Sequence, residues 1–270
     1  MTSYNGFDSI LKGKTMRTSK LIYTSILAMS FALITPASSF ADQADHEGIH
    51  ASVAAQGSGL VGAFDIVYTK ITTENDIATF HMRVTGEAGI NKPTASGQLA
   101  GSKVFSYVWP TTLDSSAVGF EANAGILALA VTSHVDFDDT PLFDENADND
   151  PNNDGDVWHS HWVVLQPNEN CGPGALGVVD IPEGANPKLP RTWPGLPLLL
   201  DSPGWDPIFD NDAVSVKVAL DDIDALHSAS YDGVTAGLRV NQSVHAPLLC
   251  VVDVFDIASG DLSLPGRVNQ

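Results

Sequence analysis

The stretch GDVWHSHWVVL, residues 155–165, places two histidines one residue apart between two tryptophans and then continues into aliphatic residues. Side chains of a β-strand alternate between two faces, so His159 and His161 would share one face and Trp158 and Trp162 the other. Both faces are then largely apolar, which predicts a strand that is buried on both sides. Two imidazoles in such a strand need partners, because burying an unpartnered polar group costs free energy.

The rest of the chain carries strand signals on both sides of this stretch. Short segments alternate apolar and polar residues, glycine, proline, aspartate and asparagine separate them, and no long segment has apolar residues at helical spacing. The letters TEN at 73–75 predict a hairpin turn. We therefore expect an all-β fold, an antiparallel β-sandwich or barrel-like domain with long irregular loops. The expected strand segments are 60–71, 76–86, 103–113, 125–137, 156–165, 214–223, 233–244 and 247–257.

The N-terminal region has the pattern of an export signal. From Met16 the chain reads MRTSK, then the apolar LIYTSILAMSFALITP, then ASSFA, so residues 1–41 are interpreted as a signal peptide with an over-extended start. The apolar run is too short and mixed to predict an integral membrane span. We expect an exported protein, either periplasmic, secreted or associated with the cell surface or outer membrane. Residues 42–58 are expected to be flexible and 59–270 to form a single β domain.

Charge and cysteine content limit the partners. The formal net charge is −20, and it becomes about −23 without the predicted signal peptide, so nucleic acid and anionic lipid are poor partners and cations are natural ones. In an exported protein the two cysteines, Cys171 and Cys250, predict a disulfide. Because a disulfide leaves no cysteine thiolate to bind a metal, a transition metal would be held mainly by histidine.

Two segments lack the strand pattern and predict long loops. Residues 181–207 are rich in proline and glycine, and residues 136–156 are rich in acidic and amide side chains. The spacing of oxygen ligands in DNDPNNDGD, 148–156, suits calcium and resembles the aspartate-rich repeats of thrombospondin type 3, although a solvated acidic loop is the alternative. The expected calcium ligands are Asp148, Asp150, Asn152, Asp154 and Asp156.

The two histidines of the strand expected at 156–165, which we call the central strand, are candidate ligands for a transition metal. His159 and His161 at positions i and i+2 can direct their ring nitrogens at one ion, whereas in the alternative they hydrogen-bond to the backbone or to an acidic neighbour. Imidazole ligands suit copper or zinc. The candidates for a further ligand are His81, His134, His227 and His245.

An exported, acidic, β-rich chain with a calcium-type loop and a histidine- and tryptophan-rich strand resembles the copper-repressible surface proteins of methanotrophic bacteria. The resemblance implies one copper(I) held by two histidines and a kynurenine made from tryptophan, and a role in copper acquisition or storage. His159 or His161 would supply one ligand and His81 or His245 the other. The family pairs tryptophan and histidine at i and i+2, a pattern that this chain lacks. The candidates for the oxidised residue are Trp109, Trp158 and Trp162, and Trp109 lies on a different strand.

Two other functions compete with copper capture. The letters HSHW look like the His-x-His-Trp strand of alpha-type carbonic anhydrases, which would make the chain a zinc enzyme. No catalytic signature such as Gly-x-Ser-x-Gly or His-Glu-x-x-His occurs, however, so we expect a protein that is not an enzyme. The second competitor is a calcium-stabilised extracellular structural or interaction protein without a transition metal.

Overall fold

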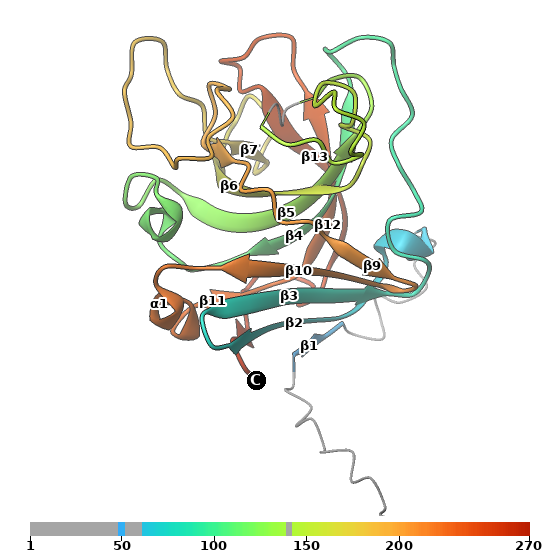
Figure 1. Ribbon diagram of the computed structural model, residues 1–270, viewed down its shortest axis with the longest axis vertical. Coiled ribbons are helices and arrows are strands. Elements are labelled where there is room, and N and C mark those ends of the chain that lie inside the picture. Colours follow the sequence, from blue (N-terminus) through green and yellow to red (C-terminus); the bar gives the residue numbers. More distant parts are fainter. Residues whose placement is uncertain (1–47, 52–60, 139–141) are drawn as a thin grey trace, which may run out of the picture. The chain divides into compact units, whose positions relative to one another are not determined.

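The computed structural model describes residues 48–51, 61–138 and 142–270. All of them belong to one compact unit, Ala44–Gln270, whereas the predicted signal peptide and most of the predicted flexible segment lie outside the described residues. Nearly every regular element is a strand, which confirms the all-β prediction (Figure 1). Within the described ranges no helix has the length and hydropathy needed to cross a bilayer.

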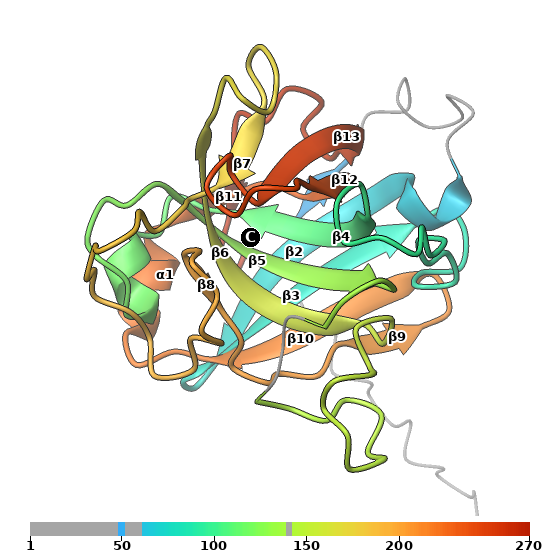
Figure 2. The same cartoon turned by 90° about the horizontal axis from the view of Figure 1, so that it is seen from above.

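Six antiparallel strands form a barrel-like sheet. Their spatial order is β5-β4-β12-β13-β7-β6, and β6 pairs back onto β5, which closes the ring (Figure 2). The short strand β8 (Leu200–Asp201) pairs with β6 and lies inside the predicted 181–207 loop, which is therefore not wholly irregular. The barrel strands are β4 (Lys103–Pro110), β5 (Ile126–His134), β6 (His159–Pro167), β7 (Leu176–Val178), β12 (Val234–Val240) and β13 (Leu249–Ile257).

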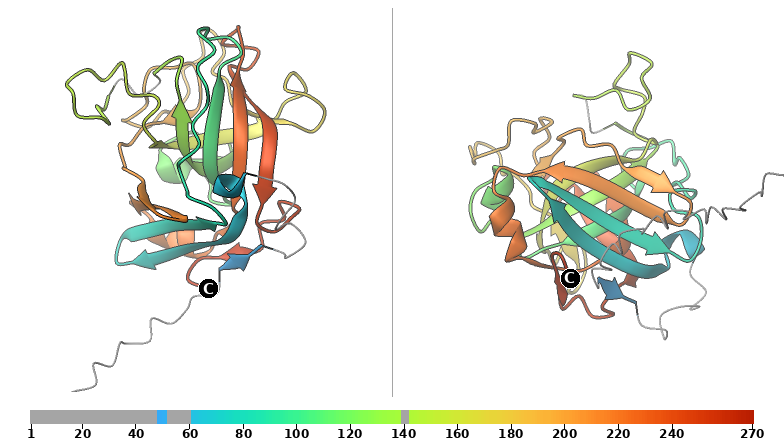
Figure 3. Two further views of the ribbon diagram at one scale, coloured as in Figure 1. Left: turned by 90° about the vertical axis from the view of Figure 1, so that its right-hand side faces the viewer. Right: turned by 60° about the horizontal axis from the view of Figure 1, so that its bottom comes forward.

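A second antiparallel sheet lies along one side of the barrel (Figure 3). Its β2–β3 hairpin turns at Asn75, which adopts a positive φ of 54° and confirms the turn predicted from TEN. Its edge strand β1 lies within the segment expected to be flexible. The two residues of β1 nevertheless pair with β2. In spatial order the strands are β1 (Ile49–His50), β2 (Ile66–Glu74), β3 (Ile77–Val84), β10 (Ala213–Ala219) and β9 (Ile208–Asp210).

Short elements complete the fold. The small sheet joins β11 to β14, and a single α-helix and two 3-10 turns occur among the described residues. Asp222 caps the helix by accepting a hydrogen bond from the amide of Ala225. These elements are β11 (Ser230–Tyr231), β14 (Gly266–Arg267), α1 (Ile223–His227), η1 (Gly62–Phe64) and η2 (Ser115–Val118).

Strand alternation separates two hydrophobic cores. Odd-numbered residues of β4 and β5, such as Trp109 and Leu129, pack with Phe80 of the second sheet, whereas even-numbered residues, such as Val108, fill the barrel. In β6 the parity is reversed, so Trp162 faces the core between the sheets and its neighbours at 161 and 163 face the barrel interior. The central strand is thus buried on both faces, as its sequence predicts.

The predicted disulfide is present. Cys171 and Cys250 are bonded, with Cα atoms 5.3 Å apart and 79 residues of separation. Cys250 lies on β13 and pairs with Gly177 of β7, the one residue pair that joins these two strands. The bond therefore reinforces the strand pairing of the barrel that has the fewest residue pairs.

Candidate metal centre

Three histidines gather at one end of the barrel. His159 and His161 are 3% and 1% exposed, and their ring centroids lie 4.8 Å apart. His134, the last residue of β5, is fully buried, and its ring centroid is 5.1 Å from that of His159. The register explains this meeting, because Thr132 pairs with His159, so the next inward-facing position on β5 is 134. We call these three residues the histidine cluster.

Hydrogen bonds orient two of these rings. Nδ1 of His159 lies 2.7 Å from the carbonyl oxygen of Val157. A carbonyl can only accept, so Nδ1 carries the proton, and in the neutral ring Nε2 holds the lone pair that a metal requires. Nδ1 of His161 lies 3.0 Å from Oγ of Ser202. The ring orientation therefore suits coordination through Nε2 at His159.

Packing holds the third ring in place. His134 stacks on Phe137 with an interplanar angle of 3° and a centroid separation of 4.2 Å. Another neighbour is Gly155, where a Cβ atom would lie only 2.4 Å from Cε1 of His134. The glycine that precedes the central strand is therefore needed because the imidazole occupies the space of its missing side chain.

The ring separations can be compared with metal coordination. A metal–nitrogen bond of about 2.0–2.1 Å puts an ion about 3 Å from each ring centroid, so two rings that share an ion have centroids at most about 6 Å apart. Both separations in the histidine cluster satisfy this limit. Within the described residues, however, no group of three or more histidine, cysteine, aspartate or glutamate side chains is arranged to hold a metal ion. Joint coordination would thus require these rings to turn.

A carboxyl pair lies beside the histidine cluster. Glu145, Trp205 and His159 line a common cavity of about 200 Å³. Burial, followed by a hydrogen bond with Asp154, raises the pKa of Glu145 to about 7. Asp154 itself is fully buried and accepts a hydrogen bond of 2.6 Å from the backbone amide of Glu145. Two acidic side chains are therefore held together next to an imidazole, and one proton relieves their repulsion near neutral pH.

The expected calcium loop is organised by its own carboxylates. Asp148 accepts from the amide of Asp150, and Asp150 accepts from the amide of Asn152. Asp156 instead forms an exposed ion pair of 3.2 Å with Lys92. Residues 139–141 of the predicted loop lie outside the described residues. Three of the five expected ligands therefore belong to a series of turns, Asp154 is buried against Glu145, and Asp156 forms a surface ion pair.

The structure does not bring the other predicted ligands to the histidine cluster. His81 faces away from the core, and its Nδ1 lies 2.8 Å from Oγ of Ser215. His245 is exposed and pairs with Asp180 at 2.9 Å. Trp109 lies in the core between the sheets and donates a 2.9 Å hydrogen bond to Thr69.

Sequence reasoning named His134 as one candidate for a further ligand but missed Glu145 and Trp205. A signal for His134 exists, since it lies near the end of the expected strand segment 125–137, just before the acidic loop that leads into the central strand. Glu145 is hidden among many acidic residues, and its partner Asp154 can be recognised only from the folded loop.

Comparison with protein-family models, with curated proteins and with solved structures finds no match for this chain, so its function has to be argued from the chemistry of this site.

Proposed function

We propose that this chain is an exported protein that captures one copper ion, in the copper(I) state, at the histidine cluster. The observation that carries the proposal is the closeness of three buried imidazoles, His134, His159 and His161, at one end of a barrel. Imidazole is a good ligand for copper, and copper(I) accepts a low coordination number, so two rings can hold it and a third can strengthen the site.

The surroundings of the histidine cluster support capture over catalysis. Both cysteines are bonded to each other, which leaves imidazole as the main metal-binding group. A catalytic metal needs an open coordination position and room for a substrate. A buried cluster between packed strands is better suited to holding an ion.

The resemblance to the copper-repressible surface proteins of methanotrophic bacteria adds an expectation about tryptophan. Trp109, Trp158 and Trp162 belong to the core between the barrel and the second sheet. Trp205 packs against the same core and in addition lines the cavity that His159 also lines. We propose Trp205 as the tryptophan to examine for oxidation to kynurenine, by peptide mass spectrometry of protein purified from its own host.

Anaerobic titration of the metal-free protein with copper(I), against a chromogenic copper(I) chelator, tests the proposal. We expect about one copper per chain for the wild type and loss of that copper in the double variant His159→Ala, His161→Ala. The single variant His134→Ala should bind more weakly. Retention of one tightly bound copper in the double variant would refute the assignment.

Matched controls use histidines outside the cluster. His81→Ala and His245→Ala remove the same type of side chain from the second sheet and from the surface, so both should keep wild-type copper binding. Zinc is titrated in parallel. Tight zinc binding together with hydration of carbon dioxide would support the carbonic anhydrase alternative instead.

Calcium binding by the acidic loop is a second candidate function, either alone or beside copper. The observation that favours it is the buried contact between Glu145 and Asp154, because a cation there would replace the shared proton. Thermal unfolding is measured in millimolar calcium, in magnesium and in chelator. Calcium-specific stabilisation that Asp154→Asn abolishes would support this role, and equal melting temperatures in all three conditions would contradict it.

A further inference from the structure

The barrel interior contains a cavity that shares only His161 with the histidine cluster. Its volume is about 100 Å³, and most of its wall is aliphatic, from Ile126 and Leu165 at one end to Leu238 and Leu249 at the other. Protein interiors are normally packed to crystal-like density, and voids of this size are few. For comparison, an engineered apolar cavity of about 150 Å³ stays dry and binds benzene or xenon.

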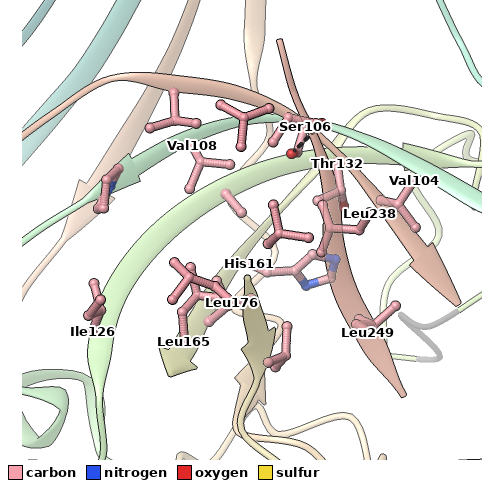
Figure 4. A pocket seen from close by; sticks show the side chains of 18 of the residues that line it. Val104, Ser106, Val108, Ile126, Thr132, His161, Leu165, Leu176, Leu238 and Leu249 are labelled. Atoms are coloured by element: carbon pink, nitrogen blue, oxygen red, sulfur yellow. Dashed lines mark hydrogen bonds between the residues drawn. The ribbon is translucent and has the colours of Figure 1, made fainter. Parts of the chain in front are cut away.

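Three residues with polar side chains lie at one end of the wall, although the surface that faces the cavity is almost wholly apolar. Figure 4 shows Ser106, Thr132 and His161 converging there, away from Ile126 and Leu165. Ser106 is satisfied, because its hydroxyl donates a 2.9 Å hydrogen bond to the carbonyl of Ala236. The hydroxyl oxygen of Thr132 is enclosed and has no hydrogen-bond partner among the described residues. Such an oxygen costs free energy that a polar group in the cavity would recover.

The barrel wall is incomplete beside this cavity. Strand β13 pairs with β7 only at Cys250, and among the described residues β13 has no hydrogen-bonded neighbour on that side beyond this point. Val254 lines the cavity from this part of β13 and is 54% exposed. Leu176 and Leu262, which are partly exposed, also line it. An apolar molecule therefore has a route from solvent that does not require the strands to separate.

We propose that the barrel interior is a binding site for a small, largely apolar molecule, about the size of benzene, that carries one hydrogen-bonding group. The apolar body would occupy the aliphatic part of the cavity, and the polar group would bond to the hydroxyl of Thr132, whose enclosed oxygen has to turn toward the cavity. A mostly apolar pocket with few polar groups is the usual composition of small-molecule sites. This proposal goes beyond copper capture and does not depend on it, so it is tested on metal-free protein.

The test uses benzene and phenol, which differ by one hydroxyl group. Binding is measured by calorimetry and by chemical-shift changes of the methyl groups that line the barrel. We expect saturable binding of both compounds and about a threefold to tenfold preference for phenol, the usual value of one hydrogen bond. In Thr132→Val, which keeps the shape but removes the hydroxyl, phenol should lose this preference while benzene binding is kept.

A second variant tests the location. Ala236 lies on β12 and lines the cavity, so Ala236→Val narrows the cavity. This variant should lower the affinities for benzene and phenol by a similar factor. The matched control is Ala78→Val, a buried alanine of the second sheet that does not line the cavity and should leave binding unchanged once the variant is seen to be folded. Absence of saturable binding in the wild type, or a phenol preference that persists in Thr132→Val, would overturn the proposal.

Discussion

Removal of the disulfide should destabilise the protein by several kcal/mol. Cys171 and Cys250 close a loop with a sequence separation of 79 residues. In the chain-entropy model, a cross-link across a loop of this length disfavours the unfolded chain by about 4.5 kcal/mol at 25 °C. The native state also depends on the bond, because β7 and β13 are joined by one residue pair only. We therefore expect Cys171→Ala, Cys250→Ala to lower the free energy of unfolding by about 4–5 kcal/mol.

Equilibrium unfolding in urea, followed by tryptophan fluorescence, measures this change. Wild-type protein in reducing buffer serves as the control and should agree with the double variant, because both lack the cross-link. Hydrogen exchange should accelerate most in β13 beyond Cys250, where, within the part of the chain that the structure describes, this strand pairs with a neighbour on one side only. A loss below about 1 kcal/mol would refute the reasoning, since the chain-entropy model gives the cross-link a contribution several times larger.

Three further predictions concern the barrel end and the residues beside it. Gly155→Ala should destabilise the protein by about 1–3 kcal/mol and weaken copper binding, because the new methyl group overlaps the ring of His134; calorimetry and the copper titration check both effects. In metal-free protein, the raised pKa of Glu145 means that the folded state holds its proton more tightly, so the free energy of unfolding should fall as pH rises from about 4.5 to about 7. Glu145→Gln should flatten this dependence in urea titrations, and an unchanged slope would contradict it. Thr132→Val should stabilise the ligand-free protein by about 1 kcal/mol, because it removes a buried hydroxyl oxygen that has no hydrogen-bond partner; a lower melting temperature would count against this.

The fold class could be predicted because its signals are local. Alternation with a period of two, turn residues between segments and the absence of helical periodicity are all visible in the chain, and eight expected segments overlap the long strands. Closure of the barrel could not be predicted, because it depends on the pairing of β6 with both β5 and β7. The short strands β7, β8 and β9 have two or three residues each, too few to carry a period.

The site could be predicted only in part, for a related reason. The spacing of His159 and His161 on one strand fixes that they share a face, and in the structure their ring centroids lie 4.8 Å apart. Which histidine joins them depends on strand order and register, and those place His134 rather than His81 or His245 beside His159. Residue type therefore narrows the candidates, and pairing between strands selects among them.

The two proposed sites share a residue, which connects their energetics. His161 lines the apolar cavity, and its ring lies 4.8 Å from that of His159 in the histidine cluster. If coordination of copper turns the ring of His161, it also changes the polar end of the cavity beside Thr132. Thermodynamic linkage then requires the effect to be reciprocal, so that a molecule in the barrel changes the affinity for copper by the same factor by which copper changes the affinity for that molecule. Because β6 is buried on both faces, a ring that turns displaces the side chains packed against it, and we therefore expect metal and cavity ligand to influence each other through β6.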